Sequence, residues 1–132
     1  MSEQSTSMPG ELAQQLLETV SQWGNTTTII LHGGCVFEFK GVFPKGELAH
    51  GFYNLKGENG FEGHLNLDKV ARIRFQSKAH RGQESHAFVF ESSDDECLFK
   101  IFLGRDADGV LHSDQKEQFL ALKNQHTTGE HA

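Results

Sequence analysis

The apolar residues of the chain follow two different periods, which divide it into helical and strand-forming parts. Leu12, Leu16 and Val20 recur at the four-residue spacing of a helix, which we expect to run over about 9–24. Beyond this segment the period changes to two, the alternation that is typical of half-buried strands. Helical character returns near the end of the chain, where we expect a second helix over about 113–124.

Seven strand-like runs lie between the two helical segments. The first two are separated by Gly33-Gly34, and because glycine accepts positive φ at both turn positions, this pair predicts a hairpin. The expected strands cover about 26–32, 35–43, 49–55, 61–67, 70–76, 85–91 and 97–103. We therefore predict an α+β fold, with a large antiparallel sheet of about seven or more strands and a helix at each end. One domain is expected over 1–132, with 1–8 and 125–132 disordered.

The strand expected over 61–67 separates its apolar and polar side chains. Apolar residues and a glycine at the odd positions alternate with Glu62, His64 and Asn66 at the even positions. Successive side chains of a strand point to opposite faces of the sheet. His64 is therefore expected to point away from the apolar side of its own strand.

Charge and composition exclude several classes of protein. The net charge of −6 argues against general nucleic-acid binding, and no stretch approaches the roughly 18 apolar residues of a membrane span, so we expect a soluble cytoplasmic protein. Segment 40–81 carries eight bases against four acids, whereas both flanking segments are acidic. This positive segment could bind a small anion, or it could be a solvated sheet face of mixed charge. Cys35 and Cys97 lie in separate strand-like runs and are expected to be buried free thiols.

The eleven phenylalanines and eight histidines are the most distinctive part of the composition. Four histidines fall in strand-like runs, namely His32, His50, His64 and His86. No pair has the spacing of a zinc site, and the signatures of nucleophilic catalysis are absent, so no catalytic residue is expected. A lone strand histidine is most often structural, but haem iron needs only one or two axial ligands. These features permit haem binding without selecting it.

Several short motifs, taken in order, resemble those of the HutX/ShuX/ChuX family of intracellular haem-utilisation proteins. The matching stretches are Trp-Gly-Asn-Thr-Thr-Thr at 23–28, Val-Phe-Glu-Phe-Lys-Gly at 36–41, His-Gly-Phe-Tyr-Asn-Leu at 50–55, Gly-His-Leu at 63–65, Glu-Ser-His at 84–86 and Leu-Phe-Lys-Ile-Phe-Leu-Gly-Arg-Asp at 98–106. The resemblance extends from Trp23 to about Leu122. Members of the family often carry a further helical segment ahead of the first helix expected here.

The resemblance implies a homodimeric α+β fold related to one half of the larger HemS/ChuS-type haem-trafficking proteins. It also implies a cytoplasmic carrier that binds haem b and passes it to a haem-degrading or haem-storage partner. Two alternatives stay open at this point. The protein could be a haem-degrading enzyme, or it could be a non-haem dimeric interaction module or a flavin-binding module.

The resemblance also implies candidate haem contacts. His64, in Gly-His-Leu, lies at the position associated with haem binding and is the leading candidate for the iron ligand. His32 lies beside the position, here Leu31, at which some relatives have a second functional histidine. Apart from the resemblance, His86 and Tyr53 are further ligand candidates should His64 not bind the iron. The positive segment also supplies three bases that could pair with the haem propionates, namely Arg72, Arg74 and Arg81.

Overall fold

Nine strands and two helices occupy residues 6–129, the part of the chain that the computed structural model describes, the side chains of His80 and Thr128 excepted. The strands are β1 (Ser7–Pro9), β2 (Asn25–His32), β3 (Cys35–Val42), β4 (Gly46–Ala49), β5 (Phe52–Leu55), β6 (Gly63–Leu65), β7 (Arg72–His80), β8 (Gln83–Glu91) and β9 (Cys97–Leu103). The helices are α1 (Ala13–Val20) and α2 (Ser113–Gly129), and 3-10 turns cover Gly10–Leu12 and Leu67–Lys69. The predicted α+β class, with a mostly antiparallel sheet, is confirmed.

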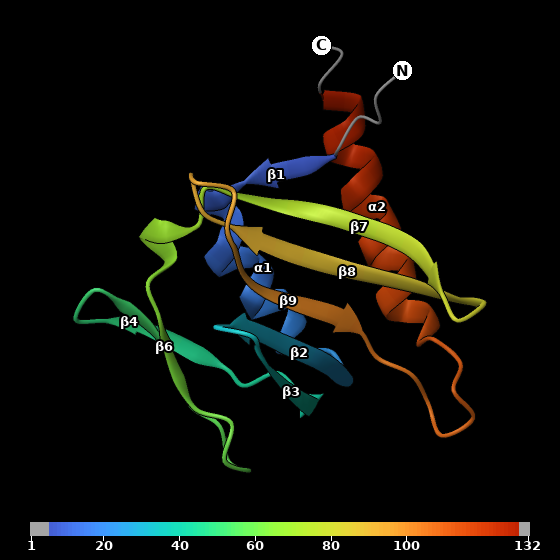
Figure 1. Ribbon diagram of the computed structural model, residues 1–132, viewed down its shortest axis with the longest axis horizontal. Helices are drawn as coiled ribbons and strands as arrows, with labels where there is room; N and C mark the ends of the chain where they lie inside the picture. Colours follow the sequence, from blue (N-terminus) through green and yellow to red (C-terminus); the bar gives the residue numbers. More distant parts are fainter. Residues whose placement is uncertain (1–5, 130–132) are drawn as a thin grey trace.

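The strands form two antiparallel sheets rather than one. Six of them pair in the order β1-β7-β8-β9-β2-β3, and β4-β5-β6 form a smaller sheet that lies beside β3 in Figure 1. The predicted hairpin at Gly33-Gly34 is confirmed, because both glycines have positive φ and β2 pairs with β3 without interruption from Asn25↔Val42 to His32↔Cys35. The expected strand over 61–67 is shorter, with only Gly63–Leu65 in the ladder.

The run expected as one strand over 49–55 contains a turn, so this prediction was wrong. His50 and Gly51 have φ values of 56° and 82°, and Ala49 pairs with Phe52 across them. Two consecutive left-handed residues make the kind of tight turn that joins hairpin strands. Apolar residues lie directly before and after the turn, so the hydrophobic pattern does not reveal that the strand is interrupted.

Both ends of the described chain are more regular than the sequence predicts. Ser7–Pro9 forms β1 on the edge of β7, where we expected a disordered start, and α2 continues to Gly129 rather than ending near residue 124. The rest of the expected disorder, at 1–5 and 130–132, lies outside the described residues. Gly10 allows the close passage after β1, since a Cβ there would lie 1.8 Å from the carbonyl oxygen of Val70.

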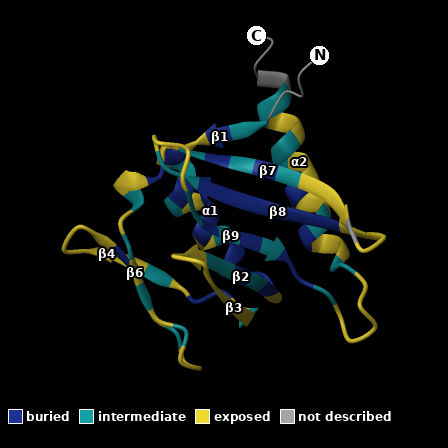
Figure 2. Ribbon diagram, in the orientation of Figure 1, coloured by how far each residue is buried: buried dark blue, intermediate teal, exposed yellow. Residues whose placement is uncertain are grey.

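The core lies between the two helices and one face of the six-stranded sheet. Both helices cover the same face, behind the sheet in Figure 1, and Phe88 of β8 contacts the rings of Trp23, Phe75 and Phe119 there. Figure 2 shows β8 as the most continuously buried strand. No helix of residues 6–129 covers the opposite face of the six-stranded sheet, which we call the open face.

The small sheet joins this core through its inner side. Tyr53 and Leu55 of β5 are buried, and Phe61, just before β6, stacks on Phe39 of β3 with ring centroids 4.6 Å apart. Phe43 contacts the edge of the same ring at 5.5 Å. Aromatic side chains therefore connect the two sheets, and they fix which side of the small sheet faces outward.

The cysteines are free, as expected, but neither is fully buried, so that part of the prediction was wrong. Cys35 is exposed because it begins β3, the outermost strand of the large sheet, whereas Cys97 is half-buried on β9. Burial raises the pKa of the Cys97 thiol. Within residues 6–129 no disulfide forms.

Candidate functional site

His64 lies on the outward side of the small sheet. It occupies the middle of β6, exposed, between the half-buried Gly63 and Leu65. This confirms the predicted orientation of its side chain. Its Nδ1 atom is 2.6 Å from Oδ1 of Asn54, the residue directly opposite on β5. The exposed ring of Phe52 meets the imidazole edge-on, with ring centroids 6.2 Å apart.

Tyr53 lies on the opposite side of the same sheet and is fully buried. Its ring passes so close to Gly46 that a Cβ there would lie 2.4 Å from a ring carbon. Its hydroxyl finds no hydrogen-bond partner among the described residues, and burial raises its pKa. Tyr53 and His64 therefore face different sides of the sheet, and only His64 faces solvent.

His86 is a structural histidine in this fold. It is buried on the helix-bearing face of β8, where its ring packs against Phe119 with centroids 5.1 Å apart. Nδ1 lies 2.8 Å from the hydroxyl of Ser77, and Nε2 lies 2.7 Å from a carboxylate oxygen of Glu84. The bonds from His86 and Lys116 lower the pKa of that carboxyl group. Both ring nitrogens of His86 are thus engaged by the protein itself.

The other sequence candidates lie on the large sheet. His32 is exposed at the end of β2, beside the Gly33-Gly34 turn. Arg72 and Arg74 both bond Glu91, with Nε···O distances of 2.9 and 3.1 Å. Arg81 is exposed in the β7–β8 turn with φ of 55°. The structure therefore divides the predicted site residues between the two sheets and brings only Arg72 and Arg74 together.

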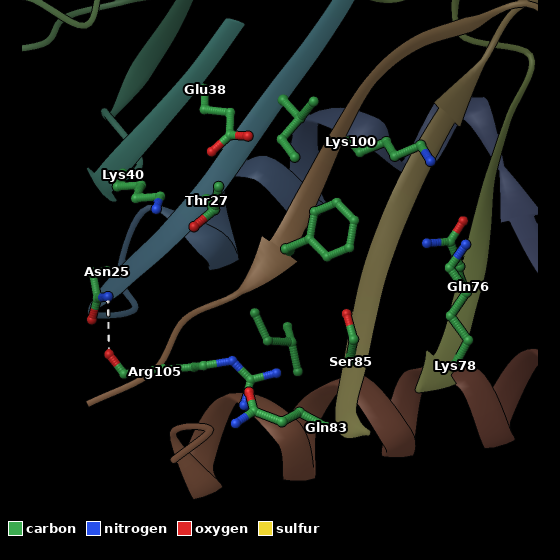
Figure 3. Close-up of a pocket in the computed structure, with 13 residues that line it drawn as sticks. Asn25, Thr27, Glu38, Lys40, Gln76, Lys78, Gln83, Ser85, Lys100 and Arg105 are labelled. Carbon is green, nitrogen blue, oxygen red and sulfur yellow. Dashed lines mark hydrogen bonds between the residues drawn. The ribbon is translucent and has the colours of Figure 1, made fainter. Parts of the chain in front are cut away.

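A cleft that the sequence did not reveal hollows the open face of the large sheet. Its volume is about 600 Å³, and side chains from β2, β3, β7, β8 and β9 line it (Figure 3). Ile29 and Phe102 contribute apolar surface, and Lys40, Lys78 and Lys100 contribute amino groups. These three lysines make no ion pair within the described part of the chain. None of the described residues that line the cleft is a histidine.

The strand order explains why the cleft escaped prediction. Lys40 lies on β3 and Lys78 on β7, which are separated in the sheet by β8, β9 and β2. The alternation of side chains along a strand places each lysine on one face, but it does not say which strands are adjacent. The same holds for Asn54, whose position opposite His64 depends on the pairing of β5 with β6.

No group of three or more His, Cys, Asp or Glu side chains between residues 6 and 129 is arranged to hold a metal ion. No helix in this same part of the chain is long and apolar enough to cross a membrane.

Comparison with known proteins identifies the family. The family described as haem utilisation ChuX/HutX matches residues 6–122. The chain belongs to this family. The intracellular heme transport protein HutX of Vibrio cholerae serotype O1 is 43% identical over 118 residues, which cover 89% of this chain and 61% of HutX. This chain therefore spans less than two thirds of the length of that relative.

Solved structures of ChuX/HutX relatives share the fold. A crystal structure of ChuX matches with a TM-score of 0.85 at 31% identity, covering 94% of this chain and 78% of ChuX. Holo-PhuS, a heme-binding protein from Pseudomonas aeruginosa, matches with a TM-score of 0.76 at 15% identity, covering 90% of this chain and 34% of PhuS. The expected structural relation to part of a larger haem-trafficking protein is confirmed.

Proposed function

We propose that the protein binds haem and carries it in the cytoplasm, as the HutX relative is named for transporting heme. The observation that carries this proposal is the presentation of His64. Its ring is exposed, its Nδ1 is held by Asn54, and its Nε2 makes no hydrogen bond within the described residues. A haem iron needs one such imidazole nitrogen as an axial ligand.

The surroundings of His64 suit a flat apolar cofactor. Phe52 lies beside the imidazole on the same outward side and is itself exposed. Burying such an aromatic face against a porphyrin ring removes apolar surface from water, which is favourable. We propose haem b as the form bound, because Cys35 and Cys97 are too far apart in the sequence for the paired cysteines of covalent haem attachment.

The propionates need cationic partners, and the structure changes which bases are the better candidates. Arg72 and Arg74 both pair with Glu91, and Arg72 also pairs with Asp95, so recruiting either arginine would break an existing ion pair. Lys40, Lys78 and Lys100 have no such partner among residues 6–129, and Arg81 is exposed. We propose that propionate contacts come from these four unpaired bases.

A second copy of the chain is the partner we propose for the β2–β3 side of the open face. Leu31, Val36 and Val42 point to this face at its β2–β3 side and remain exposed. The adjoining strand β3 is an edge with unpaired backbone groups along its outer side. A homodimer would bury these side chains and cover the edge. The receiving partner that we propose for the haem is a haem-degrading or haem-storage protein.

A hemin titration of the purified protein tests the central claim. Saturable binding with a shifted Soret band is expected, and His64→Ala is expected to weaken binding at least about tenfold, equivalent to about 1.4 kcal/mol. His32→Ala is the matched control, since it also removes an exposed strand histidine, and it should leave the spectrum unchanged. If His64→Ala binds haem normally while Tyr53→Phe alters the Soret band, the ligand is Tyr53 and our assignment is wrong.

A second measurement separates the carrier from the haem-degrading enzyme. The haem complex is incubated with ascorbate and oxygen, with and without catalase. A carrier is expected to keep its Soret band when catalase removes hydrogen peroxide. Steady loss of the band in the presence of catalase, with a defined open-chain product, would assign a haem-degrading activity instead.

A further inference from the structure

Asn54 is bound in a way that leaves its side-chain amide a single orientation. Its Nδ2 lies 3.3, 3.1 and 3.2 Å from the backbone carbonyl oxygens of Glu47, Ala49 and Phe52. Carbonyl oxygens only accept hydrogen bonds, so the amide nitrogen must be the atom that faces them. The opposite end of the amide, Oδ1, therefore faces His64 and can act there only as an acceptor.

This orientation determines the protonation pattern of the neutral His64 ring. The Nδ1···Oδ1 distance is 2.6 Å, and since Oδ1 cannot donate, Nδ1 must carry the hydrogen. The lone pair of the neutral imidazole then belongs to Nε2, the nitrogen that a metal would use. Which nitrogen of a histidine binds a metal is set by the hydrogen bond of the other nitrogen.

We propose that Asn54 is the positioning residue for His64. It selects the tautomer with a free Nε2, fixes the plane of the ring, and makes the imidazole a stronger ligand by accepting the hydrogen bond that Nδ1–H donates. This inference rests on the proposed haem binding. The position of Asn54 supports it, because β5 is the central strand of the small sheet and the β4–β5 hairpin holds the amide at three points.

Two substitutions separate positioning from a simple structural tether. Asn54→Leu removes both the acceptor toward His64 and the donor toward the hairpin. Asn54→Asp keeps an acceptor oxygen toward His64 but loses the donor. If Asn54 only tethered the hairpin, Asn54→Asp would be at least as harmful as Asn54→Leu. Asn59→Asp, in the loop before β6, is the control for the added charge.

The first readout uses the protein without haem. Long-range ¹H–¹⁵N NMR spectra of histidine-labelled protein, at a pH where the ring is neutral, distinguish a hydrogen on Nδ1 from one on Nε2. The wild type, Asn59→Asp and Asn54→Asp are expected to show His64 with the hydrogen on Nδ1. Asn54→Leu is expected to shift toward the Nε2–H tautomer. A wild-type ring with its hydrogen on Nε2 would overturn the inference whatever the haem experiments show.

The second readout uses the haem complex. Asn54→Leu is expected to weaken haem binding about 10- to 100-fold, the usual effect of removing a partner of a metal-binding histidine. In the His64→Ala background the same substitution should change the affinity less than twofold. The midpoint potential of the bound iron should rise in the order Asn54→Asp, wild type, Asn54→Leu, because a stronger acceptor makes the imidazole a better donor.

The outcomes distinguish this inference from the proposed function. Normal haem binding by His64→Ala would reject His64 as the ligand, while the NMR experiment would still decide the tautomer. Weak binding by His64→Ala together with equal effects of Asn54→Leu and Asn54→Asp on the potential would retain the ligand and reject the positioning role.

Discussion

The buried side-chain amide of Gln115 allows the effect of one substitution on stability to be estimated. The amide serves as the hydrogen-bond partner of two backbone groups, the N–H of Gly104 and the carbonyl oxygen of Asn25. Oε1 accepts from the buried backbone N–H of Gly104 at 2.8 Å, and Nε2 donates to the carbonyl oxygen of Asn25 at 3.0 Å. This side chain on α2 thus joins the end of β9 to the start of β2. Asn25 and the residues on both sides of Gly104 also line the cleft.

Gln115→Met keeps the length and helix propensity of the side chain but removes both polar atoms. Leaving the buried Gly104 N–H without a partner costs about 1–3 kcal/mol, and the bond to the more exposed Asn25 carbonyl is worth about 0.5–1.5 kcal/mol. We therefore expect a loss of about 2–4 kcal/mol in the free energy of unfolding. For a chain of 132 residues this corresponds to a fall in Tm of roughly 7–14 °C.

Urea unfolding followed by circular dichroism measures this loss, and calorimetry measures the Tm. The control is Gln125→Met on an exposed position of the same helix, which should change stability by less than about 0.5 kcal/mol. A Gln115→Met protein that unfolds within about 0.5 kcal/mol of the wild type would show that water or the chain itself replaces the lost partners. The reasoning from buried, unpaired groups would then fail at this site.

Two further predictions concern assembly and pH. Val36→Lys on the open face should convert the proposed dimer to a monomer, as measured by light scattering. Val110→Lys is the control, because Val110 is 59% exposed and Val36 is 56% exposed, and it should leave the dimer intact. A dimer that survives both substitutions would place the interface elsewhere. The lowered pKa of Glu84, bonded to His86, means that the native state favours its carboxylate. The stabilisation from this carboxylate is fully present at a pH above 4.5, the ordinary pKa of a glutamate, and it is lost as the pH falls toward the lower pKa of the native state. Glu84→Gln lacks this carboxylate, so between pH 6 and pH 3.5 it should lose less stability than the wild type. Equal losses in the two proteins would exclude this linkage.

The sequence predicted features that depend on neighbouring residues and missed those that depend on strand pairing. The Gly33-Gly34 hairpin and the outward orientation of His64 follow from local alternation and turn chemistry, and both are correct. The pattern could not separate β4 from β5, because apolar residues lie directly on both sides of the His50-Gly51 turn. It also could not show that both ring nitrogens of His86 are occupied.

For the candidate site, the sequence predicted individual residues but not the partners that strand pairing places beside them. The family resemblance selected His64, but the partner Asn54 becomes visible only when β5 and β6 are set in register. The arginines were chosen because they lie in a positive segment, and Glu91, which pairs with two of them, lies on a different strand. Long-range pairing, rather than residue type, decides which charges are available to a ligand.

The pairing of β2 with β9 has a consequence for how the protein folds. It joins Thr26 to Leu103 and so connects the β2–β3 hairpin to the β7–β8–β9 meander, two units that each consist of strands adjacent in the sequence. Local hairpins close short loops and form quickly, whereas contacts between distant residues must first overcome a larger loss of chain entropy. The cleft spans this same junction. We therefore expect the cleft to be completed only at the slow, long-range step of folding, after the hairpin and the meander have both formed.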